Sequence, residues 1–186
     1  MIENIEKLPD KDLVQIAITG VDQAFSEIVK RHKSKIANII FSMLGYTQEA
    51  EDVGQEVFIR FYNSMSNFKG EAELKTYLSR IAINLSLNEL KRREKRRFFS
   101  LDKVGNNKSL WYKNNLQENI ENKDIVNKSL QRLNSKLKSV LVLRLINEFS
   151  TEETAKILNI PIGTVLSRLA RGQEKLRKIL SSFIVN

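Results

Sequence analysis

The stretch STEETAKILNIPIGTVLSRLARGQEKLR, residues 150–177, predicts two short helices joined by a tight turn. Ser150 and Glu153 fit a capping box, in which the serine oxygen accepts a backbone N–H and the glutamate reaches back to the serine backbone. Asn159 tolerates the left-handed conformation that ends a helix, and Pro161 begins a helix more readily than it continues one. We therefore expect the first helix to end near Asn159 and the second to begin near Pro161.

The second of these helices has two different faces. The residues of its buried face recur at spacings of three and four and are Val165, Leu169, Gly172, Leu176 and Leu180. A neighbouring face carries Thr164, Arg168, Arg171, Lys175 and Lys178. A short helix, a tight turn and a basic second helix are typical of a helix-turn-helix, whose second helix fits a major groove. The alternative is a pair of core helices with a solvated basic face.

The composition narrows the possible classes of protein. The chain has 186 residues, of which 31 are Lys or Arg and 22 are Asp or Glu, and the resulting net charge of +9 suits a polyanionic partner. The absence of cysteine excludes disulfides and thiolate metal sites. No apolar run approaches the roughly 18 residues of a membrane span, and the N-terminus lacks a signal pattern. We expect a cytoplasmic protein without membrane insertion.

The chain is expected to be nearly all helix. Seven Gly and two Pro leave few interruptions, and no alternating strand pattern is evident. Residues 98–124 are rich in Asn and Lys and contain few apolar side chains, so they cannot bury enough surface to fold alone. The prediction is an all-α fold of two small helical domains, 1–97 and 125–186, joined by a flexible linker over 98–124. The C-terminal domain contains the helix-turn-helix.

An amphipathic helix is predicted from Thr47 to Met65. Its apolar row is Val53, Val57 and Phe61, and a different face carries Glu49, Asp52, Gln55 and Glu56. These acids could be solvated, could bind a metal, or could dock a basic partner. A di-metal bundle would need Glu-x-x-His pairs on other helices, and these are absent. His32 is the only histidine, and without an evident acid–base partner it is expected in solvent or in packing.

The next helix, over about 71–97, has a strongly basic end. Its buried row is Leu74, Leu78, Ile81 and Leu85. The six basic residues of the segment Lys91 to Arg97 exceed what the helix dipole requires. Phe68 and Tyr77 near this surface could stack on unpaired bases. Both aromatics could equally belong to the core.

Three segments together resemble a known family. QEAEDVGQEVFIRFY, FKGEAELKTYLSRIAINLSLNELKRR and the helix-turn-helix with GTVLSRLARGQEKLR are similar to the bacterial sigma-70 family, in the family's order. The resemblance is to the extracytoplasmic-function type. It implies a protein that lends core RNA polymerase its promoter recognition and helps it to melt DNA. It also implies no enzymatic activity, no catalytic residue, no metal and no cofactor.

The resemblance also assigns roles to residues. Asp52, Gln55 and Glu56 match the positions that dock the clamp coiled coil of the largest polymerase subunit, and the flap of the second-largest subunit is a further implied partner. The loop from Asn67 to Glu73 would receive a flipped base. The residues implied at the minus-ten element are Phe68, Lys69, Lys75, Tyr77, Arg80, Asn84 and Arg92. Those implied at the minus-thirty-five element are Thr164, Ser167, Arg168, Arg171 and Lys175.

Some features depart from the family or leave a choice open. Leu166 stands where Lys or Arg is common, and Ala170 stands where a larger side chain is common, so the resemblance does not determine the sequence preference at the upstream element. The expected partners are core RNA polymerase, promoter DNA and an anti-sigma factor. The alternative is a two-domain helix-turn-helix regulator that acts without polymerase. A nucleic-acid enzyme is disfavoured, since neither a metal cluster nor a phosphate-cradling loop is evident.

Overall fold

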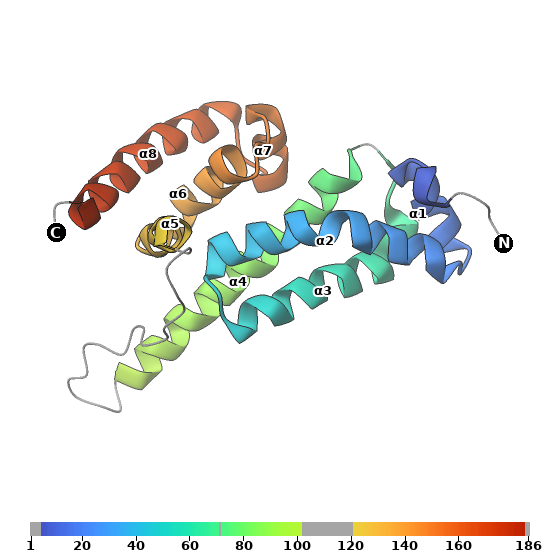
Figure 1. The fold of residues 1–186 in the computed structure, drawn as a ribbon, viewed down its shortest axis with the longest axis horizontal. Coiled ribbons are helices and arrows are strands. Elements are labelled where there is room, and N and C mark those ends of the chain that lie inside the picture. The colour runs from blue at the N-terminus through green and yellow to red at the C-terminus, as the bar shows by residue number, and fades with distance from the viewer. Residues whose placement is uncertain (1–4, 71, 102–120, 185–186) are drawn as a thin grey trace.

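The chain is helical in the computed structural model, which describes residues 5–70, 72–101 and 121–184 (Figure 1). The elements in chain order are η1 (Ile5–Lys7), α1 (Asp10–Ile18), α2 (Asp22–Leu44), α3 (Gln48–Ser64), η2 (Met65–Asn67), α4 (Leu74–Leu101), α5 (Glu121–Gln131), α6 (Ser135–Leu141), η3 (Val142–Ile146), α7 (Thr151–Leu158) and α8 (Ile162–Ile184). No strand occurs among the described residues. The all-α prediction is confirmed.

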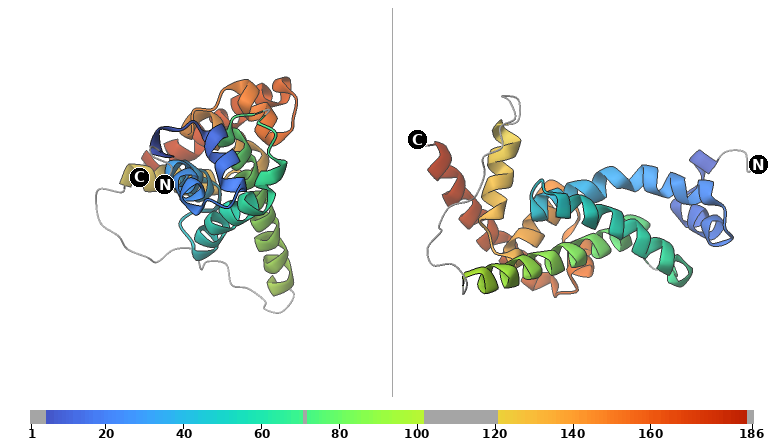
Figure 2. Two further views of the ribbon diagram at one scale, coloured as in Figure 1. Left: turned by 90° about the vertical axis from the view of Figure 1, so that its right-hand side faces the viewer. Right: turned by 90° about the horizontal axis from the view of Figure 1, so that it is seen from below.

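The long helices α2, α3 and α4 form the N-terminal bundle, in which each contacts the other two (Figures 1 and 2). Apolar residues at helical spacing point into it, and Ile40, Phe61 and Leu78 are each fully buried. Burying one such side chain contributes about 1.5–3 kcal/mol. In the row predicted for α4, Ile81 is only half-buried, while the other three members are buried. The bundle therefore fixes the outward faces of α3 and α4, where the predicted site residues lie.

Arg31 of α2 ties the N-terminal turn and α1 to the bundle. Its guanidinium donates to the carbonyl oxygens of Glu6 and Leu8 at 2.8 and 2.7 Å, and to the Asp10 carboxylate at 3.0 Å. The other oxygen of Asp10 lies 2.8 Å from Nε2 of His32. His32 is buried, as a role in packing requires, but the premise that it lacks an acid–base partner is wrong. The partner lies 22 residues away in sequence, on another helix.

The C-terminal domain is built from α5 to α8. Asn134 caps α6, since its side chain accepts the backbone N–H of Leu137 at 3.0 Å. α8 crosses α6 at Gly172, where an added Cβ would lie 3.0 to 3.2 Å from the side chain of Leu141. A larger residue at Gly172 would thus force Leu141 to move, and the glycine permits close approach of the two helices.

The C-terminal end of α2 joins the two domains. The last carbonyl oxygens of a helix have no partner within it. Those of residues 42, 43 and 44 accept from Gln131, Lys138 and Arg93 at 3.1, 3.1 and 2.9 Å respectively. Gln131 belongs to α5, Lys138 to α6 and Arg93 to α4. Two of these three caps come from the C-terminal domain, so its position is set by the end of α2.

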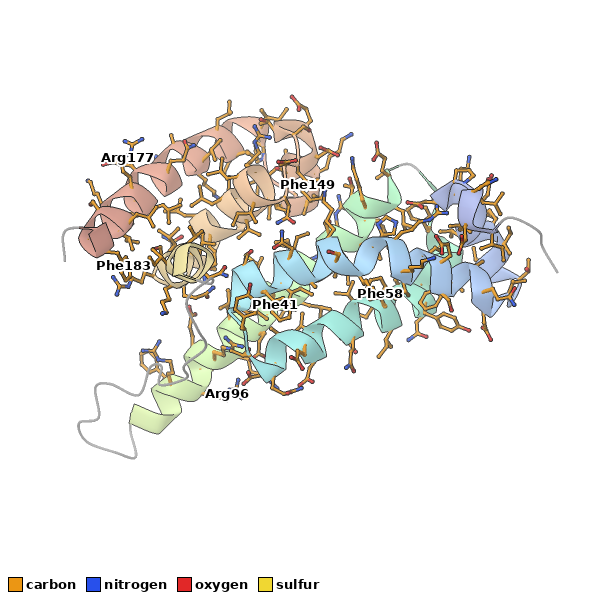
Figure 3. All side chains as sticks on the ribbon, in the orientation of Figure 1. Phe41, Phe58, Arg96, Phe149, Arg177 and Phe183 are labelled. Carbon is orange, nitrogen blue, oxygen red and sulfur yellow. The ribbon has the colours of Figure 1, made fainter. Side chains whose placement is uncertain are left out.

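The two domains share one hydrophobic core in the described arrangement. Leu130, Leu141 and Phe149 belong to the same buried cluster as the interior of the N-terminal bundle. Phe149 lies on the side of its domain that faces α2, and the Nζ of Lys35 lies 4.6 Å from its ring centre (Figure 3). Within the predicted linker, α4 continues to Leu101 and α5 begins at Glu121. The rest of that segment, with the predicted flexibility, lies outside the described residues.

Candidate nucleic-acid and partner interfaces

The acidic face predicted on α3 lies on the outside of the bundle. Asp52 and Gln55 are exposed, and Glu56 is half-buried. Glu56 accepts from Nε of Arg60 at 2.7 Å, and Asp52 accepts from Gln48 at 3.4 Å. Contacts between such accessible groups contribute less than about 1 kcal/mol. The two carboxylates can therefore exchange these weak contacts for contacts with a basic partner.

The metal alternative for these acids has no support in the part of the chain that the structure describes. No group of three or more His, Asp or Glu there could hold a metal ion. Glu49 instead faces Arg93 and Arg96 at 3.4 and 3.9 Å. Its pKa is lowered, first by the hydrogen bond that its carboxylate accepts from its own backbone N–H and also by the two arginines.

Glu89 organises the basic end of α4. Its carboxylate is 7% exposed and accepts from Arg92, Arg93 and Arg96 at 2.7, 3.2 and 2.9 Å (Figure 3 shows Arg96). Arg93 also donates to the Thr47 hydroxyl at 2.7 Å, and it is only half-exposed. Arg93 is thus a structural residue, a role that the run of basic letters did not indicate. Arg92, predicted at the DNA, remains exposed.

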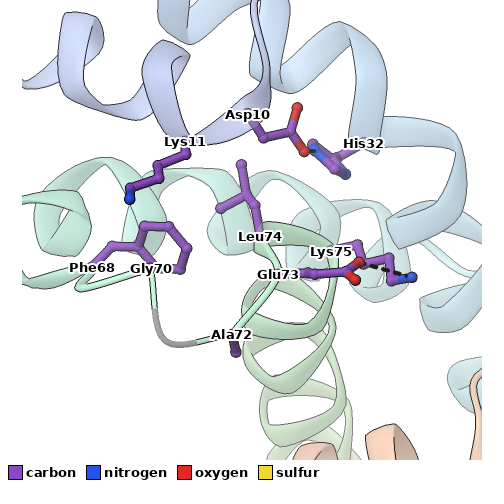
Figure 4. Close-up of a pocket in the computed structure, with 9 residues that line it drawn as sticks. All are labelled: Asp10, Lys11, His32, Phe68, Gly70, Ala72, Glu73, Leu74 and Lys75. Atoms are coloured by element: carbon purple, nitrogen blue, oxygen red, sulfur yellow. Dashed lines mark hydrogen bonds and ion pairs between the residues drawn. The ribbon is translucent and has the colours of Figure 1, made fainter.

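A pocket of about 480 Å³ opens where the loop after η2 meets α1 and α2 (Figure 4). Its lining residues are Asp10, Lys11, His32, Phe68, Gly70, Ala72, Glu73, Leu74 and Lys75. Phe68 and Leu74 supply apolar wall, and Lys11 and Lys75 supply positive charge (Figure 4). An apolar cavity with a few polar groups is typical of a small-ligand site, and this one lies at the loop predicted to receive a flipped base. Gly70 has φ of 72°, a conformation that favours glycine in this loop.

Phe68 and Tyr77 belong to an aromatic cluster. Their ring centres are 5.2 Å apart, and that of Tyr77 lies 6.0 Å from Phe61, both edge-on. Phe68 is 9% exposed, whereas Tyr77 is half-buried and its hydroxyl lies 3.3 Å from that of Ser64. Both rings therefore support the core, and Phe68 also forms one wall of the pocket. Stacking on bases stays a prediction for both.

Other residues predicted at the minus-ten element contact the C-terminal domain. Lys75 lies 2.9 Å from Glu73 and 3.2 Å from Glu153, and these two acids, Glu73 first, raise its pKa. Arg80 donates to the backbone carbonyl of Lys156 in α7. The sequence did not predict these contacts, which join predicted DNA-binding residues of α4 to α7. Asn84 and Lys69, from the same predicted set, are exposed.

The helix-turn-helix forms as predicted. The Ser150 hydroxyl accepts the N–H of Glu153 at 3.0 Å, and the Glu153 carboxylate accepts the N–H of Ser150 at 2.7 Å. Asn159 ends α7 in the left-handed conformation, with φ of 51° and ψ of 52°. Val165 is fully buried against α6 and α7, which anchors the first turns of α8.

The outward face of α8 carries the residues predicted for the upstream element. Ser167, Arg171 and Lys175 are exposed, whereas Thr164 and Arg168 are half-buried. The Ser167 hydroxyl donates to the Thr164 carbonyl at 3.1 Å. Because this hydroxyl is exposed, it can donate to another acceptor instead. The structure thus brings these five residues onto one accessible surface. Two large apolar side chains that are exposed on another side of the same turns, Ile162 and Leu166, were not among the predicted contacts.

Comparison with known proteins gives matches over most of the chain. Residues 28–96 match the family model Sigma-70 region 2, and residues 123–176 match Sigma-70, region 4. The ECF RNA polymerase sigma factor SigW of Bacillus subtilis is 34% identical over 170 residues, which cover 87% of this chain and 91% of that protein. The ECF RNA polymerase sigma-E factor of Escherichia coli is 31% identical, with 92% of this chain and 94% of that protein covered.

Solved structures share the fold. CnrH in complex with the cytosolic domain of CnrY has a TM-score of 0.69 at 23% identity, with 93% of this chain and 97% of that chain covered. The sigma factor RpoE in complex with the anti-sigma factor NepR from Bartonella quintana has a TM-score of 0.66 at 21% identity, with 84% and 96% covered. Within the described residues, no helix is long and apolar enough to cross a membrane.

Proposed function

The chain belongs to the extracytoplasmic-function group of the sigma-70 family, whose members direct RNA polymerase to promoters for initiation, and we propose that each of its domains reads a separate promoter element. As a sigma factor it acts with core RNA polymerase on promoter DNA, and it is not itself an enzyme. The alternative of a regulator that works without polymerase is therefore set aside. Because sigma factors act with the polymerase that transcribes the chromosome, we infer that this chain acts in the cytoplasm.

The acidic face of α3 is the proposed dock for the clamp coiled coil of the largest polymerase subunit. The supporting observation is that Asp52, Gln55 and Glu56 share one accessible face, while the apolar face of α3 is buried. Asp52→Lys with Glu56→Lys should abolish binding to core polymerase and leave the helical circular dichroism intact. Asp12→Lys with Glu94→Lys changes the net charge equally at exposed acids on other helices and should still bind. Unchanged affinity of the first pair would exclude this dock.

The pocket at the loop after η2 is the proposed site for a base flipped out of the non-template strand at the minus-ten element. Its volume, its apolar wall and its two lysines support this assignment. Asn84 is exposed, and its amide both donates and accepts, which suits a base edge that strand separation uncovers. Asn84→Ala should impair open-complex formation while duplex recruitment is retained.

The outward face of α8 is the proposed reader of the minus-thirty-five element. Arg168→Ala with Arg171→Ala should weaken recruitment to duplex DNA by about 1–3 kcal/mol per base contact. Opening of a pre-melted template should be largely spared. Gel shifts on duplex DNA and permanganate footprinting of unpaired thymines report the two steps separately. Equal loss of both steps in the α8 variant and in Asn84→Ala would contradict the division of labour.

Binding of DNA by α4 requires the contacts between the two domains to exchange. Lys75 and Arg80, which we assign to the minus-ten element, contact α7 in the described arrangement. Phosphates would take the place of Glu153 and of the Lys156 carbonyl. CnrH and RpoE were each solved in complex with a second protein, in the latter case an anti-sigma factor. We propose that an anti-sigma factor also binds this chain, and that the C-terminal domain reaches the flap of the second-largest subunit in the holoenzyme.

A further inference from the structure

Two aliphatic side chains lie exposed at the start of α8. Leu166 is 52% exposed and Ile162 is 48% exposed. They are one helical turn apart, so they form one apolar flank of the helix. Single exposed apolar residues are common on proteins, but this pair stands in the first turns of the second helix of a helix-turn-helix. Those are the turns whose side chains meet base edges in that motif.

The same surface carries a polar flank and a gap between the two flanks. Around the helix axis, Leu166 and Arg171 lie about 140° apart, at 3.6 residues per turn. Between them, within residues 162–171, the exposed residues are Gly163, Ser167 and Ala170, all of them small; larger exposed side chains at these angles, of which Glu174 is the first, occur only in later turns. The helix can therefore approach a groove closely, with an aliphatic edge on one side and a guanidinium on the other. The net charge of +9 favours a polyanion as the occupant.

The chemistry of the major groove offers only one group that suits an aliphatic side chain. Guanine, cytosine and adenine present hydrogen-bonding groups there, and thymine adds its 5-methyl group. We propose that Leu166, supported by Ile162, contacts thymine 5-methyl groups in the upstream promoter element and so determines part of its sequence. This inference rests on the proposed role of α8 at that element. It adds recognition of the methyl group, which the hydrogen bonds of the arginines and of Ser167 cannot read.

Replacement of thymine by uracil tests this inference, because it removes the methyl group and leaves every hydrogen-bonding group in place. Holoenzyme containing the full chain would first select duplexes with a randomised upstream element. Each thymine of the selected element would then be replaced in turn by uracil. At one or two positions the affinity should fall roughly fourfold, which corresponds to one buried methyl group. In Leu166→Ala holoenzyme the effect of the same replacements should be clearly smaller.

Two controls keep the outcome clear. Leu145 is 47% exposed but lies in η3, outside the helix-turn-helix, so Leu145→Ala should retain the full response to uracil. A cytosine at the sensitive position should bind better when it is 5-methylated. Equal binding of thymine and uracil at every position, or an undiminished response in Leu166→Ala, would overturn the inference. Failure to select any upstream element would instead overturn the proposed role of α8.

Discussion

Raising the pH above about 8 should stabilise this protein through Lys138. Its ammonium is buried at the junction of the two domains, where Nζ donates to the Met43 carbonyl at 3.1 Å and to the Gln131 side chain at 2.7 Å. No carboxylate accompanies it in these contacts. Burial first, and then the charge of Arg93, lower the pKa of Lys138 from 10.5 to about 8.

The sign and the size of the effect follow from proton linkage. The unfolded chain, with Lys138 in water, binds the proton more tightly than the folded chain, so stability rises with pH between the two pKa values. Below pH 8 both states carry the charge, and the folded state bears the full cost of burying it. The difference between 10.5 and about 8 corresponds to about 3 kcal/mol. This cost should be relieved progressively from pH 8 to 10.5.

Urea denaturation between pH 7.5 and 10 would measure this cost. The free energy of unfolding of the wild type should rise with pH relative to that of Lys138→Met, which has no charge to lose. Lys136→Met removes an exposed lysine two residues away and should follow the wild type. Comparison between variants cancels the contributions of the carboxylates and of all lysines except Lys136 and Lys138, because these groups are common to all three chains. Parallel pH profiles for wild type and Lys138→Met would refute the reasoning.

Further predictions concern packing, capping and the contact between domains. Gly172→Ala should destabilise the chain, because its Cβ would lie 3.0 Å from a leucine of α6, whereas Gly54→Ala, with 4.0 Å of space, should stabilise α3 by up to about 1 kcal/mol in urea denaturation. Ser150→Ala should cost about 1 kcal/mol and lower the Tm, while Ser150→Thr keeps most of the cap. Asn38→Cys and Asn147→Cys, whose native side chains lie 3.3 Å apart, should become cross-linkable by a short bis-maleimide in this cysteine-free chain. Cross-linked protein should lose run-off transcription while single-cysteine variants keep it, and full activity after cross-linking would contradict the exchange of contacts at α4.

Features encoded within a few residues could be predicted from the sequence. The capping box at Ser150, the left-handed Asn159 and the buried face around Val165 each depend on spacings of three or four residues. The same holds for the acidic face of α3, which follows from helical periodicity alone. Local hydrogen bonds and side-chain direction determine such features, so neither a partner helix nor a fold is needed to see them.

Features that depend on distant segments could not be predicted. His32 meets Asp10 across 22 residues of sequence, and Lys138 meets the end of α2 across 95. In sequence, the basic run of α4 resembles a uniform nucleic-acid surface, yet Arg93 is used to cap α2. A cation's role is set by which unpaired carbonyl or carboxylate the fold brings near it, and only the packed structure supplies that neighbour.

Lys75 and Arg80 show how the described arrangement relates to the proposed function. Their polar contacts with α7 are accessible to solvent, and such contacts contribute less than about 1 kcal/mol each. DNA phosphates offer the same two side chains at least comparable partners, so these contacts alone cannot hold the domains together. The larger contributions to the packing of the two domains come from their shared apolar surface and from the capping of α2 by Gln131 and Lys138. The equilibrium between packed and separated domains is therefore decided at the end of α2 and in the common core, away from the residues that we assign to DNA.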